Sequence, residues 1–203
     1  MIETYYIGGS PCSGKSTIAE MLAKKYNFKY FKVDDHLDEY TKEGALQGRP
    51  ICMKQLAMNS EQIWMRDPSV QCQEELLFYD EIFEYIVRDL KKITSNSSII
   101  TEGAAYLPTL MSKCNVPRNR YFSVIPSKEF QIYHYKRREW VPYVLSECKD
   151  KEKAFLNWME RDALFALNIY NQCKMEGFSS IINDGSIAIE TLLCIISQHF
   201  GLE

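Results

Sequence analysis

The sequence predicts an α/β fold built on a parallel β-sheet, and two observations support this. Five short segments rich in β-branched and aromatic residues alternate with amphipathic helical segments along the chain. Three of these five segments are followed directly by a glycine or a carboxylate. Strands that alternate with helices form βαβ units, and the carboxyl ends of their strands gather at one edge of the sheet. We therefore expect the functional groups to lie at that edge.

The expected strands are short, and polar residues, glycine or proline follow each of them. In chain order they cover residues 2–7, 30–33, 98–101, 120–125 and 179–182. Pro126 stops the fourth strand, because proline cannot donate a ladder hydrogen bond.

Helical patterns fill the spaces between the strands. Apolar residues recur at helical spacing in residues 17–26, 73–93, 155–175 and 187–200, with Ser186 as the expected N-cap of the last helix. About 64 residues separate the second strand from the third, and about 53 separate the fourth from the fifth. A crossover needs only about a dozen residues. We therefore expect one domain over 1–203, with a substrate-covering helical insertion at about 36–95 and a polar, mobile lid at about 137–160.

The most specific motif lies between the first strand and the first helix. Residues 9–16 read Gly-Ser-Pro-Cys-Ser-Gly-Lys-Ser and match G-x-x-x-x-G-K-[ST] at every fixed position. We expect this loop to bind a nucleoside triphosphate, with Lys15 on the β- and γ-phosphates and Ser16 on Mg²⁺. Nearby N–H groups are expected to lower the pKa of Cys12. The expected nucleotide-binding residues are Gly9, Ser10, Pro11, Cys12, Ser13, Gly14, Lys15, Ser16 and Thr17.

Two adjacent carboxylates follow the second strand, about 20 residues after Lys15. Phosphoryl transfer needs a group that orients the nucleophile or accepts its proton, and it needs negative charge near Mg²⁺. Asp34 and Asp35 are the expected catalytic residues, with Asp34 also near the metal and Asp35 also in contact with the acceptor. The sequence leaves open which of the two is the base.

A third acidic position follows the third strand. Glu102 occupies the place of a Walker B carboxylate, which holds Mg²⁺ through water, and Gly103 permits close approach of a substrate. We assign both residues to the substrate site. The alternative for Glu102 is an ordinary helix cap or edge charge.

Arginines form the last group of candidates. Arg138 and Arg161 are expected to stabilise the transferring phosphoryl group, together with Lys15, and Arg137 to contact the nucleotide. The alternative is a solvated basic helix face. Arg49 and Arg66 are expected to hold a phosphate or carboxylate on the acceptor, although a surface arginine packed on an aromatic ring is an equal alternative.

Composition narrows the functional classes. The chain has 203 residues, is 46% hydrophobic and carries a net charge of −3, which gives no reason to expect nucleic-acid binding. It has no run of 18 apolar residues and no visible signal peptide, so we expect no membrane partner. Seven cysteines without a C-x-x-C pair argue against a disulfide framework or a zinc site and favour a reducing cytoplasm.

Together, these residues resemble P-loop kinases of the nucleoside-monophosphate, shikimate and gluconate kinase type. The resemblance rests on the glycine-rich loop, on Asp34-Asp35 and Glu102-Gly103, and on the arginines 137, 138 and 161. It implies a three-layer P-loop NTPase fold, in which helices cover both faces of a five-stranded parallel sheet of order 2-3-1-4-5, with a helical lid. It also implies ATP and Mg²⁺ as cofactors, and residues 183–186, Asp184 among them, near the adenine.

The leading hypothesis is an ATP-dependent kinase that transfers the γ-phosphoryl group to a hydroxyl of a small metabolite. The segment from Glu102-Gly103 to Leu107-Pro108 favours a metabolite over a nucleoside monophosphate, which stays the first alternative. A regulatory ATPase or switch with a protein partner is the second alternative, although the chain lacks an Asn-Lys-x-Asp segment for guanine. A sensor that binds ATP without turnover is the third. A monomer or a homodimer is expected.

Overall fold

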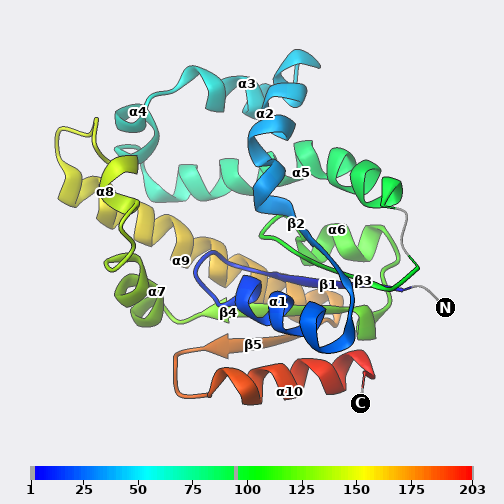
Figure 1. The fold of residues 1–203 in the computed structure, drawn as a ribbon. Helices are drawn as coiled ribbons and strands as arrows, with labels where there is room; N and C mark the ends of the chain where they lie inside the picture. Colours follow the sequence, from blue (N-terminus) through cyan, green and yellow to red (C-terminus); the bar gives the residue numbers. More distant parts are fainter. Residues whose placement is uncertain (1–2, 94–95, 203) are drawn as a thin grey trace.

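The computed structural model describes residues 3–93 and 96–202. One five-stranded parallel sheet runs through the centre in the order β2-β3-β1-β4-β5 (Figure 1). Its strands are β1 (Thr4–Gly9), β2 (Lys29–Lys32), β3 (Ile99–Glu102), β4 (Tyr121–Pro126) and β5 (Ser179–Asn183). The expected α/β class, parallel pairing and strand order are confirmed.

The register of the strands places the candidate residues at one edge of the sheet. Ile7 of β1 and Lys32 of β2 both pair with Glu102, the last residue of β3. Gly9 at the end of β1 pairs with Val124 of β4. The glycine-rich loop, the segment after β2 and Glu102 therefore leave the sheet side by side.

Helices cover both faces of the sheet. On one face, α1 (Lys15–Tyr26) and α10 (Ile189–Phe200) pack on alternate residues of β1, β3 and β4, forming an apolar core that includes Ile7, Leu22, Ile100, Val124 and Ile196 (Figure 1). On the other face, α5 (Pro68–Lys92), α6 (Pro108–Lys113) and α9 (Lys151–Glu176) form a second core that includes Ile86, Ile99, Met111, Ile125 and Phe165. This alternation is what a buried parallel strand with helices on both sides requires.

The two long connections are helical. After β2, the chain forms the 3₁₀ turn η1 (Val33–His36), α2 (Leu37–Leu46), α3 (Pro50–Ala57) and α4 (Ser60–Trp64) before α5. A short 3₁₀ turn, η2 (Arg118–Arg120), leads into β4. After β4, the chain forms α7 (Lys128–Tyr135) and α8 (Val141–Val144) before the long helix α9.

The expected lid packs against the expected insertion. Trp64 at the end of α4 stacks on Trp158 of α9 with ring centroids 4.3 Å apart. The Lys149 backbone N–H donates a 2.8 Å hydrogen bond to Glu61 Oε2. A third apolar cluster lies here, with Val141, Leu145, Cys148 and Trp158 buried and Trp64, Met65 and Cys12 packed against it. The expectation of a polar lid is therefore wrong at Val141, Leu145 and Cys148.

Element boundaries differ from the expectations by a few residues. Pro126 is the last residue of β4 and Glu102 the last residue of β3, rather than the residues that follow them. Helix α5 begins at Pro68, because the Asp67 side chain accepts hydrogen bonds from Ser69 and Val70. Helix α10 begins at Ile189 with Ala188 as its N-cap, so the expected role of Ser186 is wrong. Ile2, the first residue of the first expected strand, lies outside the described residues. So do residues 94–95, the end of the expected insertion.

Two expectations, one about membrane-spanning segments and one about disulfides, can be compared with the described residues. No helix described here is long and apolar enough to span a bilayer. No disulfide joins the seven cysteines, all of which lie in described parts of the chain.

Candidate active site

The glycine-rich loop folds tightly against the end of β4. Gly9 has φ 126°, and a Cβ at this position would lie 1.9 Å from the carbonyl oxygen of Val124, so only glycine fits. Gly14 has φ 93° and precedes the first turn of α1. Ser10 and Ser13 are fully buried within the loop, and Pro11 is half-buried. The loop thus presents backbone N–H groups and the positive end of a 12-residue helix to the same space.

Lys15 is held inside this loop. Its side chain is buried, and its ammonium group donates a 3.2 Å hydrogen bond to the carbonyl oxygen of Ser10. A polyphosphate bound to the N–H groups of the loop would bring its anionic oxygens close to this ammonium group. The position matches the role expected from the motif.

Ser16 and Glu102 form the polar centre at the end of β3. Ser16 Oγ donates a 2.9 Å hydrogen bond to Glu102 Oε1, and the Tyr30 hydroxyl donates a 3.1 Å hydrogen bond to the same oxygen. Glu102 is fully buried, and its Oε2 has no hydrogen-bond partner among the described residues. Burial and the adjacent Glu102 carboxylate raise the pKa of Tyr30. A buried carboxylate with an unused oxygen beside a serine hydroxyl fits a hard cation such as Mg²⁺.

The two adjacent aspartates after β2 lie on one turn and differ in their neighbours. Both are exposed on the turn η1, where Asp35 Oδ1 lies 3.7 Å from Lys32 Nζ. Burial, Glu75 and Asp34, in that order, raise the pKa of the buried Tyr79 hydroxyl. The carboxylate of Asp35 is engaged by a lysine.

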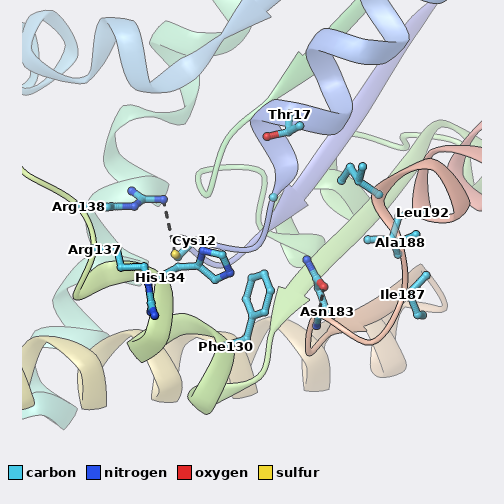
Figure 2. A pocket seen from close by; sticks show the side chains of 13 residues that line it. Cys12, Thr17, Phe130, His134, Arg137, Arg138, Asn183, Ile187, Ala188 and Leu192 are labelled. Atoms are coloured by element: carbon cyan, nitrogen blue, oxygen red, sulfur yellow. Dashed lines mark hydrogen bonds between the residues drawn. The ribbon is translucent and has the colours of Figure 1, made fainter.

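A large cavity, which we call the loop cavity, opens beside the glycine-rich loop (Figure 2). It measures about 650 Å³, and Phe130 and His134 of α7 face the segment after β5 across it. The Asn183 side chain donates a 2.9 Å hydrogen bond to the carbonyl oxygen of Ser13, which ties that segment to the loop. The cavity is lined by Cys12, Gly14, Thr17, Phe130, His134, Arg137, Arg138, Asn183, Gly185, Ile187, Ala188, Ile189 and Leu192.

Not every residue expected around the nucleotide lies in this lining. The carboxylate of Asp184 accepts hydrogen bonds from Ser186 N and Oγ at 2.9 and 2.5 Å, and Asp184 is absent from the described lining of the loop cavity. Its neighbours Asn183 and Gly185 line the cavity instead. The expected contact of Asp184 with the nucleotide stays a prediction, and its carboxylate is engaged in a local turn with Ser186.

Arg137 and Arg138 both line the loop cavity but are held differently. Arg138 Nη2 lies 3.5 Å from Cys12 Sγ, so the loop is in direct contact with the segment that follows α7 (Figure 2). Arg137 Nη1 donates a 2.9 Å hydrogen bond to the Tyr133 carbonyl oxygen, and its guanidinium lies over the Tyr133 ring. Burial raises the pKa of Cys12 despite the nearby Arg138, so the expected lowering is wrong.

A second cavity of about 320 Å³, which we call the insertion cavity, lies between α2–α5 and α9. Arg66 and Arg161, two of the four arginines expected at the catalytic or acceptor site, line it together with Trp64. Its complete lining is Asp38, Thr41, Gln55, Leu56, Met58, Ile63, Trp64, Arg66, Gln71, Glu74, Glu75 and Arg161.

Arg161 is the buried cation of this region. Its Nη1 lies 2.9 Å from Glu75 Oε2, and its Nε lies 2.6 Å from Asp162 Oδ1. Burial alone would lower the pKa of Arg161, but Asp162 and Glu75 raise it and keep the guanidinium charged. Burial raises the pKa of Asp162 in turn. The Ser10 hydroxyl donates a 3.3 Å hydrogen bond to the Asp162 carbonyl oxygen, so this pair is joined to the glycine-rich loop.

Arg49 and Gly103 do not reach the insertion cavity within the described lining. The guanidinium of Arg49 pairs with Glu84 on the exposed side of α5. A Cβ on Gly103 would lie 2.7 Å from the Cβ of Val33, so glycine here permits β3 to pack against η1. Both residues therefore have structural roles: Arg49 forms a surface ion pair, and Gly103 permits close packing.

Sequence reasoning missed three residues of the site. Asn183 was expected near the adenine only through the family resemblance, and its amide bond to the loop at Ser13 was not predicted. Glu75 and Asp162 were not singled out, but both pair with Arg161. Asp162 follows Arg161 directly in the sequence, and a carboxylate beside an arginine near an apolar stretch was the available signal.

The strand order and the position of the loop belong to a fold that this chain shares with solved structures of small-molecule kinases. No family model and no curated protein sequence matches the chain. Structural similarity to solved proteins, at low sequence identity, is what supports the class.

Three solved structures illustrate that similarity. An uncharacterised protein from Eubacterium ventriosum has a TM-score of 0.52 at 15% identity, covering 99% of each chain. A gluconokinase from Sinorhizobium meliloti has a TM-score of 0.50 at 11% identity, covering 98% of this chain and 92% of that one. A deoxyadenosine kinase from M. mycoides, with bound dATP, has a TM-score of 0.50 at 15% identity, covering 98% and 99%. At these identities the comparisons show a shared fold.

Proposed function

We propose that the protein transfers the γ-phosphoryl group of ATP to a hydroxyl of a small molecule. One observation carries the proposal: the glycine-rich loop lines one cavity and is hydrogen-bonded to the sequence neighbour of an arginine that lines the second. Asn183, which lines the loop cavity, bonds to Ser13, and Asp162, the neighbour of Arg161 in the insertion cavity, bonds to Ser10. A donor and an acceptor on opposite sides of one phosphate loop are what direct transfer requires.

The residues have distinct roles in this proposal. The loop N–H groups, the α1 N-terminus and Lys15 bind the donor phosphates, and Phe130, His134 and Asn183 surround the base in the loop cavity. Ser16 and Glu102 hold Mg²⁺, which supplies charge neutralisation at the β- and γ-phosphate oxygens. Arg138 at the edge of the loop stabilises the transferring group from the opposite side.

On the acceptor side, Asp34 orients the attacking hydroxyl and accepts its proton. Asp34 is assigned this role rather than Asp35 because the Asp35 carboxylate is engaged by Lys32 on the same turn. Arg161 keeps a fixed positive charge in the wall next to the loop. Two of the proteins with a similar fold are named as kinases, which agrees with the proposal.

An acceptor screen with γ-labelled ATP tests the proposal. We expect label transfer to at least one hydroxyl compound by the wild type, and a loss of about 10²–10³-fold in Lys15→Ala, the range for removing one fixed charge-stabilising donor. Lys24→Ala is the matched control, because Lys24 is an exposed lysine of the same helix. Slow ATP hydrolysis alone, unchanged in Asp34→Asn, would instead favour a regulatory ATPase.

A further inference from the structure

The two arginines of the insertion cavity already have carboxylate partners in its wall. Arg66 Nη1 pairs with Glu74 Oε2, and Arg161 Nη1 lies 2.9 Å from Glu75 Oε2. Lys54 Nζ adds a second cation to Glu74, at 2.6 Å from Oε1. Neither guanidinium is therefore an open anion-binding group, as an acceptor with a phosphate or carboxylate would require.

The charge balance of the cavity leads to the same conclusion. Its lining carries three carboxylates, Asp38, Glu74 and Glu75, against the two guanidiniums of Arg66 and Arg161. Including the direct partners Asp162 and Lys54 gives four negative against three positive groups. The wall keeps an excess of one negative charge by either count.

The charged side chains of this wall are partly withdrawn from water. The side chains of Glu74, Glu75 and Arg161 are 17%, 18% and 11% exposed. Charge interactions between groups withdrawn from water are screened much less than those at an open surface. An anionic substituent in the cavity would compete with Glu74 and Glu75 for their arginines and would meet the extra carboxylate.

We propose that the acceptor carries no anionic group and is an uncharged or cationic hydroxyl compound. This inference rests on the proposed function and deepens it by naming the acceptor class. The rest of the lining suits such a molecule, because it combines polar Thr41 and Gln55 with apolar Leu56, Met58 and Ile63. A nucleoside, a polyol or an amino alcohol meets the description, whereas a nucleoside monophosphate or a sugar acid does not.

Matched ligand pairs test the inference by binding and by transfer separately. Adenosine with AMP, glucitol with gluconate, and ethanolamine with glycolate are titrated calorimetrically into the protein saturated with a non-hydrolysable ATP analogue. We expect at least one uncharged or cationic member to bind tenfold or more tightly than its anionic counterpart. Equal or tighter binding of the anionic members overturns the inference, as does binding by neither member of every pair. Selective binding without label transfer from ATP leaves the acceptor class standing and overturns the proposed function alone.

A pair of variants isolates the role of the carboxylates. Glu74→Gln removes one negative charge from the cavity wall and releases Arg66, so we expect the anionic members to bind at least fivefold more tightly. Glu84→Gln is the matched control, because Glu84 pairs with Arg49 on the exposed side of α5 and does not belong to the cavity lining described above. An equal response of both variants, or none from Glu74→Gln, contradicts the inference.

Discussion

Ser16 and Glu102 are 86 residues apart in the sequence, and Ser16 Oγ lies 2.9 Å from Glu102 Oε1. The hydrogen bond joins the first turn of α1 to the last residue of β3, in a place where the carboxylate is fully buried. A buried charge is stable when it is paired or binds a cation. This contact is therefore the most direct point at which to test metal binding.

Glu102→Gln should weaken metal-dependent activity while leaving the fold intact. The amide keeps a hydrogen-bond acceptor for Ser16 and Tyr30 but loses the negative charge that a divalent cation needs. We expect the Mg²⁺ concentration for half-maximal transfer to rise tenfold or more, measured by Mg²⁺ titration at saturating ATP. Tyr30→Phe is the control, because it removes the second hydrogen bond and keeps the carboxylate. A similar Mg²⁺ dependence in both variants would place the metal elsewhere.

The two aspartates after β2 should differ in their effects. Asp34→Asn is expected to lower kcat by about 10²–10⁴-fold, the contribution of a positioned general base, because Asp34 is the proposed base. Asp35→Asn should stay within about threefold of the wild type, because the Asp35 carboxylate lies next to Lys32 on an exposed turn. Steady-state kinetics of the two variants decide the question, and the reverse order of effects would assign the base to Asp35.

Arg161 should be important for stability as well as for activity. Arg161→Met leaves Glu75 and Asp162 without their cation, and breaking a buried ion pair costs about 3–5 kcal/mol. Thermal or urea unfolding measures this loss. The same substitution at Arg49, Arg49→Met, removes an exposed pair with Glu84 and should leave the unfolding midpoint nearly unchanged. Similar midpoints for the two variants would mean that the Arg161 network contributes no more than a surface pair.

Glu74 makes the stability depend on pH in a defined direction. Burial alone would raise the pKa of Glu74, but hydrogen bonds from Arg66 and Lys54 lower it below the usual value of about 4.3. A carboxyl whose pKa is lowered by folding stabilises the protein above its unfolded pKa, and this stability is lost as the pH falls through the folded pKa. Glu74→Gln should therefore lower the free energy of unfolding by about 1 kcal/mol at pH 7.

The measurement is a comparison of unfolding midpoints across pH. A loss of about 1 kcal/mol corresponds to a decrease of about 2–4 °C in Tm for a chain of this size. We expect this difference between the wild type and Glu74→Gln to shrink on acidification, as the pH falls through the lowered pKa of Glu74 in the folded state. A difference that grows on acidification would show that the carboxylate is not stabilised by its cations.

Local patterns in the sequence were sufficient for the fold and for the donor side of the site. The glycine-rich loop, Lys15 and Ser16 were predictable because each fixed position answers a backbone or phosphate requirement within one short segment. The β-strands were located to within two residues because their apolar runs end in polar residues. Glu102 was identified for the same reason, since it closes an apolar strand beside the loop strand.

The acceptor side was less predictable because its residues are partnered across long sequence distances. Whether Arg49 or Arg66 enters the cavity depends on how α3, α4 and α5 pack, and a sequence shows the arginines without their carboxylates. The pKa of Cys12 depends similarly on burial against the lid cluster, which outweighs the loop N–H groups and Arg138. Side-chain pairing of this kind is set by tertiary packing rather than by a local motif.

The stacking of Trp64 on Trp158 has a further consequence for turnover. The insertion, the lid and Cys12 of the loop share one apolar cluster, so parting the two tryptophans disturbs the packing of all three segments together. For the proposed kinase, such coupling would open the donor and acceptor sites in one event and would limit the access of water to ATP while the acceptor is bound.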